Sequence, residues 1–364
     1  MQWWRVWNYA RSPAPVCGNL AAFSSPASRM KARNLLLSLF AIASAAGADP
    51  VTFAIEAPQA HQVFLAGEMT GWDQRKLPMA RGADGVWRVA LDLAPGQWLY
   101  KFVVDGRWVH DPATAEHDAD GQGGQHSYRF VGDGPWTPMA TGGGRVETHQ
   151  VASAAFGQTV KVNVYLPPGF QQGQALPVLW LLHGGGMDAD QWFRTAHVER
   201  YADRLITSGR AKPFVIVMPS SNGRRYDGPA ERFIVDELPA WLKARYGLAP
   251  TRAQSAIAGM SMGGYGSVRL PLAAPRRWGF SFALSGWYPD ELVDQVKRAG
   301  GLPVQLVLRC GTEDDLLPTN RALRDTLGSR VNYREDPGGH SFHYWSQVTA
   351  EMLAGVDAYF KGNR

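Results

Sequence analysis

Residues 255–266 read Ser-Ala-Ile-Ala-Gly-Met-Ser-Met-Gly-Gly-Tyr-Gly, and this stretch decides the fold. The four residues before Gly259 form a mostly apolar run typical of a buried strand, and the residues after Ser261 are compatible with a helix. The centre fits the pattern G-x-S-x-G, in which a sharp strand-to-helix turn raises a serine above a sheet. Glycines flank such a serine because a Cβ atom there would collide with neighbouring backbone. The stretch therefore predicts a nucleophilic Ser261, and the alternative is a glycine-rich turn that precedes a helix.

Short apolar runs alternate with helical patterns from about residue 147 to the end of the chain. Val160, Val162 and Val164 alternate with polar residues, as in a half-buried strand. This alternation predicts a mostly parallel, doubly wound sheet, with the working residues on loops at the carboxyl ends of strands. The predicted buried strands lie at 177–182, 214–218, 255–258, 280–284 and 304–308, and the predicted helices lie near 231–246, 262–272, 320–327 and 345–360.

Two histidines follow Ser261 and could serve as its base. A serine hydroxyl needs a base to accept its proton, and in this kind of fold the chain order is serine, acid, histidine. His340 follows a glycine-rich loop after the last expected strand, whereas His343 lies at or near the start of the final helix. We predict His340 as the base because a histidine on a loop can reach over the serine. His343 is expected to be a surface or substrate-cleft residue.

The acid that orients the base is expected on the loop after the strand at 304–308. This loop reads Cys-Gly-Thr-Glu-Asp-Asp from residue 310, and Asp314 is the preferred candidate, with Asp315 and Glu313 as alternatives. Three further acidic residues at 290–294 lie at an exposed-looking helix start, where a capping role accounts for them.

An oxyanion hole needs backbone N–H donors around the developing negative charge. Residues 181–186, Leu-Leu-His-Gly-Gly-Gly, follow a predicted strand, and we expect Gly185 to be one donor. The other donor in this fold is the residue after the nucleophile, which is Met262 here. His183 precedes Ser261 in the chain, and we expect it to brace the loop rather than to act in catalysis.

The chain before residue 147 has a different character. Residues 49–131 contain short apolar runs separated by turn signals, which predicts a small all-β sandwich. Residues 132–146 are rich in glycine and proline and predict a linker to a second domain at 147–364.

The first 48 residues predict a leader. They hold five basic and no acidic residues, and the 37 basic residues of the chain less these five leave 32, equal to the 32 acidic ones. The remainder is therefore neutral, which argues against nucleic acid as a partner. Residues 30–48 combine a positive start, a short apolar core and a cleavage site ending at Ala48, whereas residues 1–29 form an upstream extension. We expect export to the periplasm or beyond; the alternative is a loose N-terminal tail.

No cofactor, metal or membrane is expected as a partner. Among the histidines of the β region, His110, His117 and His126 are scattered without metal-ligand spacing, and no phosphate loop or dinucleotide motif occurs. No apolar stretch after the leader approaches 18 residues. After the leader, Cys310 is the remaining cysteine and is expected to be a small buried side chain.

The second domain contains several motifs in the same order as a known family. Because of these motifs, residues 147–362 resemble the esterase D and enterochelin-esterase branch of the α/β hydrolases, which includes the feruloyl esterases of carbohydrate esterase family 1. The resemblance implies the α/β-hydrolase fold and a triad of Ser261, Asp314 and His340. The motifs are Val164-Tyr-Leu-Pro-Pro-Gly, Leu181-Leu-His-Gly-Gly-Gly with Trp192 downstream, Val217-Met-Pro, Ile257-Ala-Gly-Met-Ser-Met-Gly-Gly, Cys310-Gly-Thr-Glu-Asp and Gly338-Gly-His340 with Trp345.

The β region resembles the glycogen-binding module of AMP-activated protein kinase β subunits and carbohydrate-binding module family 48. The resemblance implies a glycan site at Trp72, Lys101 and Trp108, since tryptophan faces stack on sugar rings and lysine donates to hydroxyls. Gln125-His126 stands where the family often has a hydrogen-bonding asparagine, and the alternative is a module retained for packing. The motifs are Val63-Phe-Leu-Ala-Gly, Gly71-Trp72, Leu77-Pro-Met, Asp84-Gly-Val-Trp87, Tyr100-Lys-Phe-Val-Val-Asp-Gly-Arg-Trp108 and His110-Asp-Pro.

Together these patterns predict an exported serine esterase joined to a glycan-binding module. The expected substrate is an acyl ester, feruloyl or acetyl, on a polysaccharide or oligosaccharide. Two alternatives stay open: an esterase for siderophore triesters of the enterochelin type, and a glycan-binding protein without catalytic activity. The sequence leaves open the acyl group, the sugar backbone and the oligomeric state.

Overall fold

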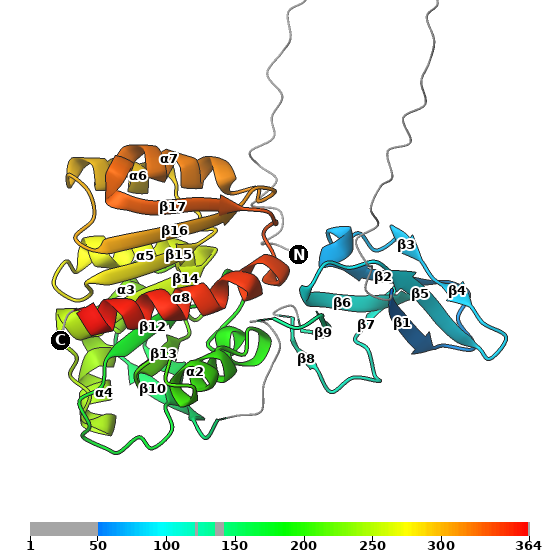
Figure 1. The fold of residues 1–364 in the computed structure, drawn as a ribbon, viewed down its shortest axis with the longest axis horizontal. Helices are drawn as coiled ribbons and strands as arrows, with labels where there is room; N and C mark the ends of the chain where they lie inside the picture. Colours follow the sequence, from blue (N-terminus) through cyan, green and yellow to red (C-terminus); the bar gives the residue numbers. More distant parts are fainter. Residues whose placement is uncertain (1–49, 121–122, 135–141, 363–364) are drawn as a thin grey trace, which may run out of the picture. The chain divides into compact units, whose positions relative to one another are not determined.

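The structure is a computed structural model that describes residues 50–120, 123–134 and 142–362 (Figure 1). The predicted leader with its signal peptide, and part of the predicted linker, lie outside the described residues. Residues Pro50–Arg364 form one compact unit. None of the helices in the described ranges is long and apolar enough to cross a membrane.

The first part of the described chain is all-β, as predicted. One sheet has the strand order β1-β5-β4, and the other has β3-β2-β6-β9-β8, with β7 paired to β6. Alternate side chains from both sheets fill a core that includes Phe53, Leu65, Trp87 and Phe102. The strands are β1 (Val51–Glu56), β2 (Val63–Gly67), β3 (Leu77–Pro78), β4 (Ala80–Arg81), β5 (Val86–Leu91), β6 (Gly96–Val104), β7 (Arg107–Val109), β8 (His117–Ala119) and β9 (Gln125–Val131).

The second part is built on an eight-stranded sheet with the order β10-β11-β13-β12-β14-β15-β16-β17. The pairs β10–β11 and β11–β13 are antiparallel, and all the others are parallel. The strands are β10 (Arg145–Ser153), β11 (Gln158–Leu166), β12 (Val178–Leu182), β13 (Val215–Pro219), β14 (Ser255–Met260), β15 (Phe280–Leu284), β16 (Gln305–Gly311) and β17 (Val331–Asp336).

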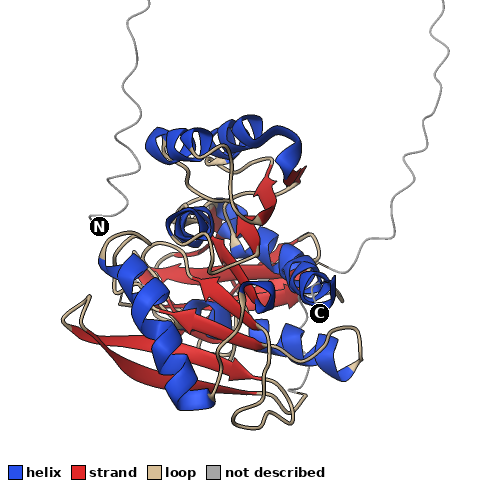
Figure 2. Ribbon diagram, turned by 90° about the vertical axis from the view of Figure 1, so that its left-hand side faces the viewer, coloured by secondary structure: helices blue, strands red, loops and turns tan. Residues whose placement is uncertain are grey.

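Helices cover both faces of this sheet (Figure 2). Because successive side chains of a strand point to opposite faces, Trp180 packs with one core cluster, whereas Leu179 and Leu181 pack with the other. The first cluster also holds side chains of α3 to α7, and the second holds those of α2 and α8. The helices are α2 (Val198–Thr207), α3 (Pro229–Arg232), α4 (Leu238–Tyr246), α5 (Met262–Ala273), α6 (Asp290–Arg298), α7 (Leu317–Leu327) and α8 (Phe342–Gly362).

The predicted fold class, a doubly wound and mostly parallel sheet preceded by a small β-sandwich, is confirmed. The five predicted buried strands match β12 to β16 to within a few residues. Two helices begin about three residues before their apolar patterns do, α7 at Leu317 and α8 at Phe342. Strand β10 begins at Arg145, two residues before the predicted start of the second domain.

Contacts join the sandwich to the second part of the chain. Trp98 on β6 stacks on His343 of α8, with ring centroids 3.8 Å apart. The Gln97 side chain donates to the backbone oxygen of Thr195 (2.8 Å), and the Thr195 hydroxyl donates to Asp118 (2.9 Å). The sandwich is therefore packed against the sheet domain through specific side chains.

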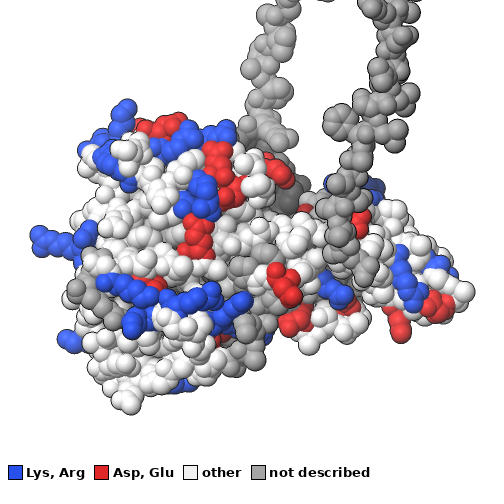
Figure 3. Space-filling view, in the orientation of Figure 1, with Lys and Arg blue, Asp and Glu red and all other residues white. Residues whose placement is uncertain are grey.

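Charged side chains of both signs occur on the face shown in Figure 3. Basic and acidic groups of the described residues form ion pairs, such as Arg334–Glu351 (2.6 Å) and Arg321–Glu335 (2.6 Å). This distribution agrees with the neutral composition of residues 49–364.

Candidate active site

Ser261 occupies the turn between β14 and α5 with φ 56° and ψ −116°. A positive φ is unfavourable for a residue with a Cβ atom, and it persists where the surroundings impose it. The turn is held by Ser261 N–H, which donates to the backbone oxygen of Leu284 (2.9 Å). A Cβ on Gly259 would lie 2.5 Å from the oxygen of Gly263, and a Cβ on Gly263 would lie 2.2 Å from the oxygen of Leu182. Both glycines of the motif are thus required by backbone packing around the serine.

His340 lies within hydrogen-bond distance of both the serine and the acid. Its Nε2 is 2.9 Å from Ser261 Oγ, and its Nδ1 is 3.0 and 3.1 Å from the two carboxylate oxygens of Asp314. Trp345 of α8 packs edge-on against the imidazole, with centroids 4.9 Å apart. The three residues are brought together as the predicted triad requires, although their catalytic roles stay a prediction.

The structure distinguishes Asp314 from its neighbours on the loop after β16. Asp314 is buried, whereas Glu313 and Asp315 are exposed. Its Oδ1 also accepts a hydrogen bond from Leu316 N–H (2.8 Å). Burial by itself would raise the pKa of Asp314, but the hydrogen bond and charge of His340 hold that pKa below its usual value. Asp314 therefore carries a negative charge at neutral pH, as the partner of an imidazolium must.

His343 lies in the contact with the sandwich. It is the second residue of α8, and its ring stacks on Trp98. Burial lowers its pKa. His343 is partly buried where it meets the sandwich, and the expectation that it is a surface or substrate-cleft residue stays a prediction.

The predicted oxyanion loop lies beside the nucleophile. A Cβ on Gly184 would be 3.6 Å from the Cβ of Ser261, and a Cβ on Gly185 would be 4.0 Å from the Cβ of Met262. Met262 begins α5, so its N–H has no partner within the helix. Gly185 and Met262 are therefore adjacent, as two donors to one oxyanion must be.

His183 braces this loop, as predicted. Its Nδ1 donates to the oxygen of Gly184 (2.7 Å), and its Nε2 accepts from Ser221 N–H (2.9 Å). One nitrogen donates and the other accepts, so the ring is neutral. Burial lowers its pKa to about 4, in agreement with this pattern.

Two further residues hold the loop and were not predicted. Gln191 accepts from Gly184 N–H (2.6 Å), and this bond leaves the next N–H, that of Gly185, as the donor candidate. Tyr226 donates to the oxygen of His183 (3.1 Å). Both are buried. Gln191 begins the helical turn that directly follows this loop, and Tyr226 lies on the loop after β13; no motif marks either residue in the sequence.

The three predicted glycan-binding residues lie together on the sandwich. The rings of Trp72 and Trp108 have centroids 6.4 Å apart, and Lys101 Nζ is 5.9 Å from the Trp108 ring. Trp108 is 44% exposed, whereas Trp72 is partly buried against the α2–α8 core cluster. Lys101 forms an ion pair with Asp120.

Gln125 and His126 stand where the glycan-binding family often has an asparagine, and only Gln125 lies on the surface. Gln125 is exposed, but His126 is buried, and its burial lowers its pKa to about 4. An exposed Trp108 fits glycan binding, and a partly buried Trp72 fits the alternative of packing.

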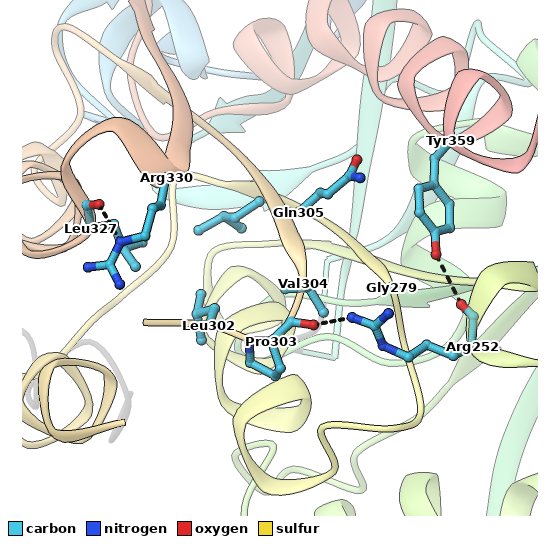
Figure 4. Close-up of a pocket in the computed structure, with 10 residues that line it drawn as sticks. Arg252, Gly279, Leu302, Pro303, Val304, Gln305, Leu327, Arg330 and Tyr359 are labelled. Carbon is cyan, nitrogen blue, oxygen red and sulfur yellow. Dashed lines mark hydrogen bonds between the residues drawn. The ribbon is translucent and has the colours of Figure 1, made fainter. Parts of the chain in front are cut away.

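A hollow of about 430 Å³ lies at the amino ends of β14 to β16 and away from the triad (Figure 4). Arg252 donates to the oxygen of Pro303, and Tyr359 donates to the oxygen of Arg252 (3.1 Å). None of the predicted site residues lines this hollow.

Two other expectations concern cysteine and metals. Cys310 is a free, buried cysteine whose pKa is raised by burial, which confirms the prediction of a small buried side chain. Within residues 50–120, 123–134 and 142–362, no group of three or more histidine, cysteine or acidic side chains could hold a metal ion.

Comparison with known proteins gives two family matches. The glycogen recognition site of AMP-activated protein kinase matches residues 50–123, and the family named Esterase matches residues 153–356. An endo-1,4-β-xylanase/feruloyl esterase of Xylanibacter ruminicola is 26% identical in an alignment of 262 positions that covers 66% of this chain and 36% of that protein. The chain spans about a third of the length of the first curated relatives it matches.

Solved structures show the same fold. The enterobactin esterase of Shigella flexneri, solved in the presence of enterobactin, is 20% identical with a TM-score of 0.70, over 84% of this chain and 92% of that one. A ferulic acid esterase is 23% identical with a TM-score of 0.53, over 59% of this chain and 98% of that one. Because the family match covers more than half of the chain and includes the elbow, the acid loop and the histidine loop, the protein belongs to the Esterase family.

Proposed function

We propose that the protein is a serine carboxylic-ester hydrolase that removes acyl groups, feruloyl or acetyl, from a polysaccharide or oligosaccharide. The observation that carries the proposal is the continuous chain of hydrogen-bonding groups from Ser261 through His340 to Asp314. Such a chain serves acyl transfer, because it activates an otherwise weak hydroxyl nucleophile.

In the first step Ser261 Oγ attacks the carbonyl carbon of the ester, and its proton passes to His340 Nε2. The carbonyl electron pair moves onto oxygen, and the N–H groups of Gly185 and Met262 stabilise the negative charge. When the tetrahedral species collapses, the alcohol leaves with the proton from His340, and the acyl group stays on Ser261.

In the second step a water molecule attacks the acyl-enzyme. His340 takes a proton from the water, and the second tetrahedral species expels Ser261 Oγ, which regains that proton from the imidazole. Asp314 keeps Nδ1–H facing its carboxylate throughout, so that Nε2 is the nitrogen that exchanges protons. The products are a free carboxylic acid and the deacylated enzyme.

The sandwich supports a carbohydrate-borne substrate. Trp108 presents an exposed indole, with Lys101 and Trp72 near it. An exposed indole beside a cationic donor suits the apolar face and hydroxyls of a sugar ring. The relative from Xylanibacter ruminicola is named for xylanase and feruloyl esterase activities, which agrees with an ester on a plant polysaccharide.

A siderophore esterase is the second candidate. The likeness to the Shigella enterobactin esterase covers both the sandwich and the sheet domain. A binding protein without activity is a weaker candidate, because all three side chains of the triad are present and within hydrogen-bond distance.

The purified protein and its Ser261→Ala variant would be given three substrates: feruloylated arabinoxylan oligosaccharides, acetylated xylan, and a cyclic triester of catechoyl serine. We expect release of ferulate or acetate by the wild type and less than about 0.1% of that rate by the variant. Hydrolysis of the catechoyl triester alone would move the assignment to the second candidate. Equal rates for both proteins would refute the serine mechanism.

Export is also proposed, on the three-part pattern of residues 30–48. Expression of the full chain in a bacterium followed by fractionation and N-terminal sequencing would test it. A mature protein that begins at Asp49 supports export, and uncleaved protein in the cytoplasm contradicts it.

A further inference from the structure

Glu68 of the sandwich places its carboxylate against the start of α8. It begins a short 3₁₀ turn, Glu68–Thr70, that follows β2. One oxygen accepts from Leu99 N–H on β6 (2.9 Å). The other accepts from Phe342 N–H (2.5 Å) and, at a longer distance, from His343 N–H (3.4 Å). One carboxylate thus links the sandwich to the helix that follows the catalytic loop.

The two donors on α8 are groups that a helix cannot satisfy by itself. Phe342 and His343 are the first two residues of α8, and the first four N–H groups of a helix lack intrahelical acceptors. Burial raises the pKa of Glu68 to about 7, whereas the hydrogen bonds from Leu99, Phe342 and His343 and the helix dipole favour its charged form. Glu68 therefore caps α8, although 274 residues separate it from Phe342.

The geometry around this cap is closely fitted. The Trp98 ring stacks on His343 at an interplanar angle of 22°. A Cβ added to Gly96, the first residue of β6, would lie 2.5 Å from the His343 ring. Because β6 and the start of α8 leave no room to slide, the Glu68 carboxylate meets Phe342 N–H at a defined place.

His340 is two residues before Phe342, on a glycine-rich loop whose other end is held by a hydrogen bond from Glu313 N–H to the oxygen of Gly338 (2.9 Å). Residues 338 and 339 are both glycine, and Gly338 has φ 137°, a conformation in which other residues are strained. The His340 side chain is 31% exposed, so packing alone does not fix it. The place of the imidazole therefore depends on where α8 begins.

We propose that Glu68 is a positioning residue for catalysis: by holding Phe342 N–H it fixes the loop that carries His340 over Ser261. The sandwich then acts in the turnover of every ester, including small soluble ones that no glycan site could bind. This role is separate from the choice of acyl group or polysaccharide, and it rests on the serine mechanism proposed above.

Glu68→Gln tests the proposal with a side chain of the same shape. An amide has one acceptor oxygen, so its NH₂ group must face either Leu99 N–H or Phe342 N–H, and one of the bonds is lost. We expect kcat for p-nitrophenyl acetate to fall between about tenfold and about a hundredfold, since misplacement of a catalytic group by about 1 Å has such an effect. KM should change less than about twofold.

Phe130→Ala is the matched control, because it removes packing between the two parts of the chain at a contact other than the Glu68 carboxylate. Phe130 packs near His197, with ring centroids 5.9 Å apart. This variant should lower the melting temperature and leave kcat within about twofold of wild type. A Glu68→Gln protein that loses thermal stability but keeps wild-type kcat would overturn the proposal, as would an equal loss of kcat in Phe130→Ala.

Two further measurements cover the remaining outcomes. If Glu68→Gln does not fold, Glu68→Asp replaces it, since the shorter side chain holds its carboxylate one methylene away from Phe342 N–H. A fall in kcat for Glu68→Asp supports the proposal, and a wild-type kcat with lower thermal stability overturns it. The rate of Ser261 labelling by a fluorophosphonate should fall in parallel with kcat. This rate needs no natural substrate, so it reports on Glu68 even if the polysaccharide ester proves wrong, whereas an unlabelled wild type would contradict the serine mechanism itself.

Discussion

Replacing Asp314 with asparagine separates orientation of the histidine from every other feature of the site. The carboxylate oxygens lie 3.0 and 3.1 Å from His340 Nδ1 and can only accept hydrogen bonds. The bond from Leu316 N–H to Oδ1 (2.8 Å) favours an asparagine that keeps its oxygen there and turns its NH₂ towards Nδ1. Nδ1 must then accept, and the imidazole proton moves to Nε2.

The expected loss follows from that change of tautomer. With a proton on Nε2, the imidazole can no longer accept the hydroxyl proton of Ser261, which lies 2.9 Å away. The variant also lacks the negative charge that stabilises the imidazolium. A loss of about 10⁴-fold in kcat, or about 5 kcal/mol, is expected for such a change. The melting temperature should change little, because the side chain keeps its volume.

The assay is the rate of p-nitrophenyl acetate hydrolysis together with fluorophosphonate labelling of Ser261. Asp315→Asn is the matched control, since Asp315 is adjacent in sequence and exposed. Glu313→Gln is a second control. A loss of less than about tenfold in Asp314→Asn, or a larger loss in either control, would refute the assignment of the acid.

The remaining predictions concern the two histidines, the indoles and acid stability. His340→Ala should cost as much kcat as removal of the serine, since triad members act as a unit, whereas His343→Ala should lower the melting temperature and keep a working enzyme; steady-state kinetics and melting curves on both proteins decide this. Trp108→Ala should weaken retention by xylan in affinity electrophoresis about fivefold, at about 1 kcal/mol for one stacked ring, without a change in melting temperature; Trp72→Ala should lower the melting temperature as well, because Trp72 packs against the core. Burial lowers the pKa of His183 from 6.5 to about 4, so the unfolded chain binds a proton that the folded chain excludes. The stability this group contributes is full above pH 6.5 and is lost as pH falls towards 4, by about 1.4 kcal/mol per pH unit; in urea unfolding at pH 7 and pH 5, His183→Asn should show a smaller difference than wild type, and an unchanged difference would contradict the neutral ring.

The sequence determined the features that depend on local pattern and chain order. The sequence predicts a strand, a sharp turn at Ser261 and a helix, because it reads as an apolar run, a G-x-S-x-G motif and a helical stretch. In the structure, Gly259 and Gly263 allow backbone atoms around Ser261 to approach more closely than a Cβ atom would permit. Strand–helix alternation then requires a mostly parallel sheet, and its carboxyl edge gathers the loops that carry Ser261, Asp314 and His340. Residues far apart in the chain were therefore predictable together.

Chain order alone does not choose among adjacent acidic residues. Glu313, Asp314 and Asp315 share one loop, and the sequence preferred Asp314, with the other two as alternatives. The tertiary structure decides, since the turn after β16 buries Asp314 and leaves its neighbours exposed. The direction of a single side chain on a loop depends on the residues that pack around it. These residues come from other parts of the chain, so the sequence of the loop does not specify that direction.

Contacts between the two parts of the chain were beyond sequence reasoning altogether. Glu68 lies between two motifs of the sandwich, residues 63–67 and 71–72, but belongs to neither, and Trp72 resembles a glycan-binding residue although it is partly buried. Local propensity and periodicity describe how a segment folds, not which distant surface it meets. Glu68 meets the start of α8 because the surfaces of the sandwich and of the sheet domain fit together there, so only the tertiary structure brings this carboxylate to the catalytic loop.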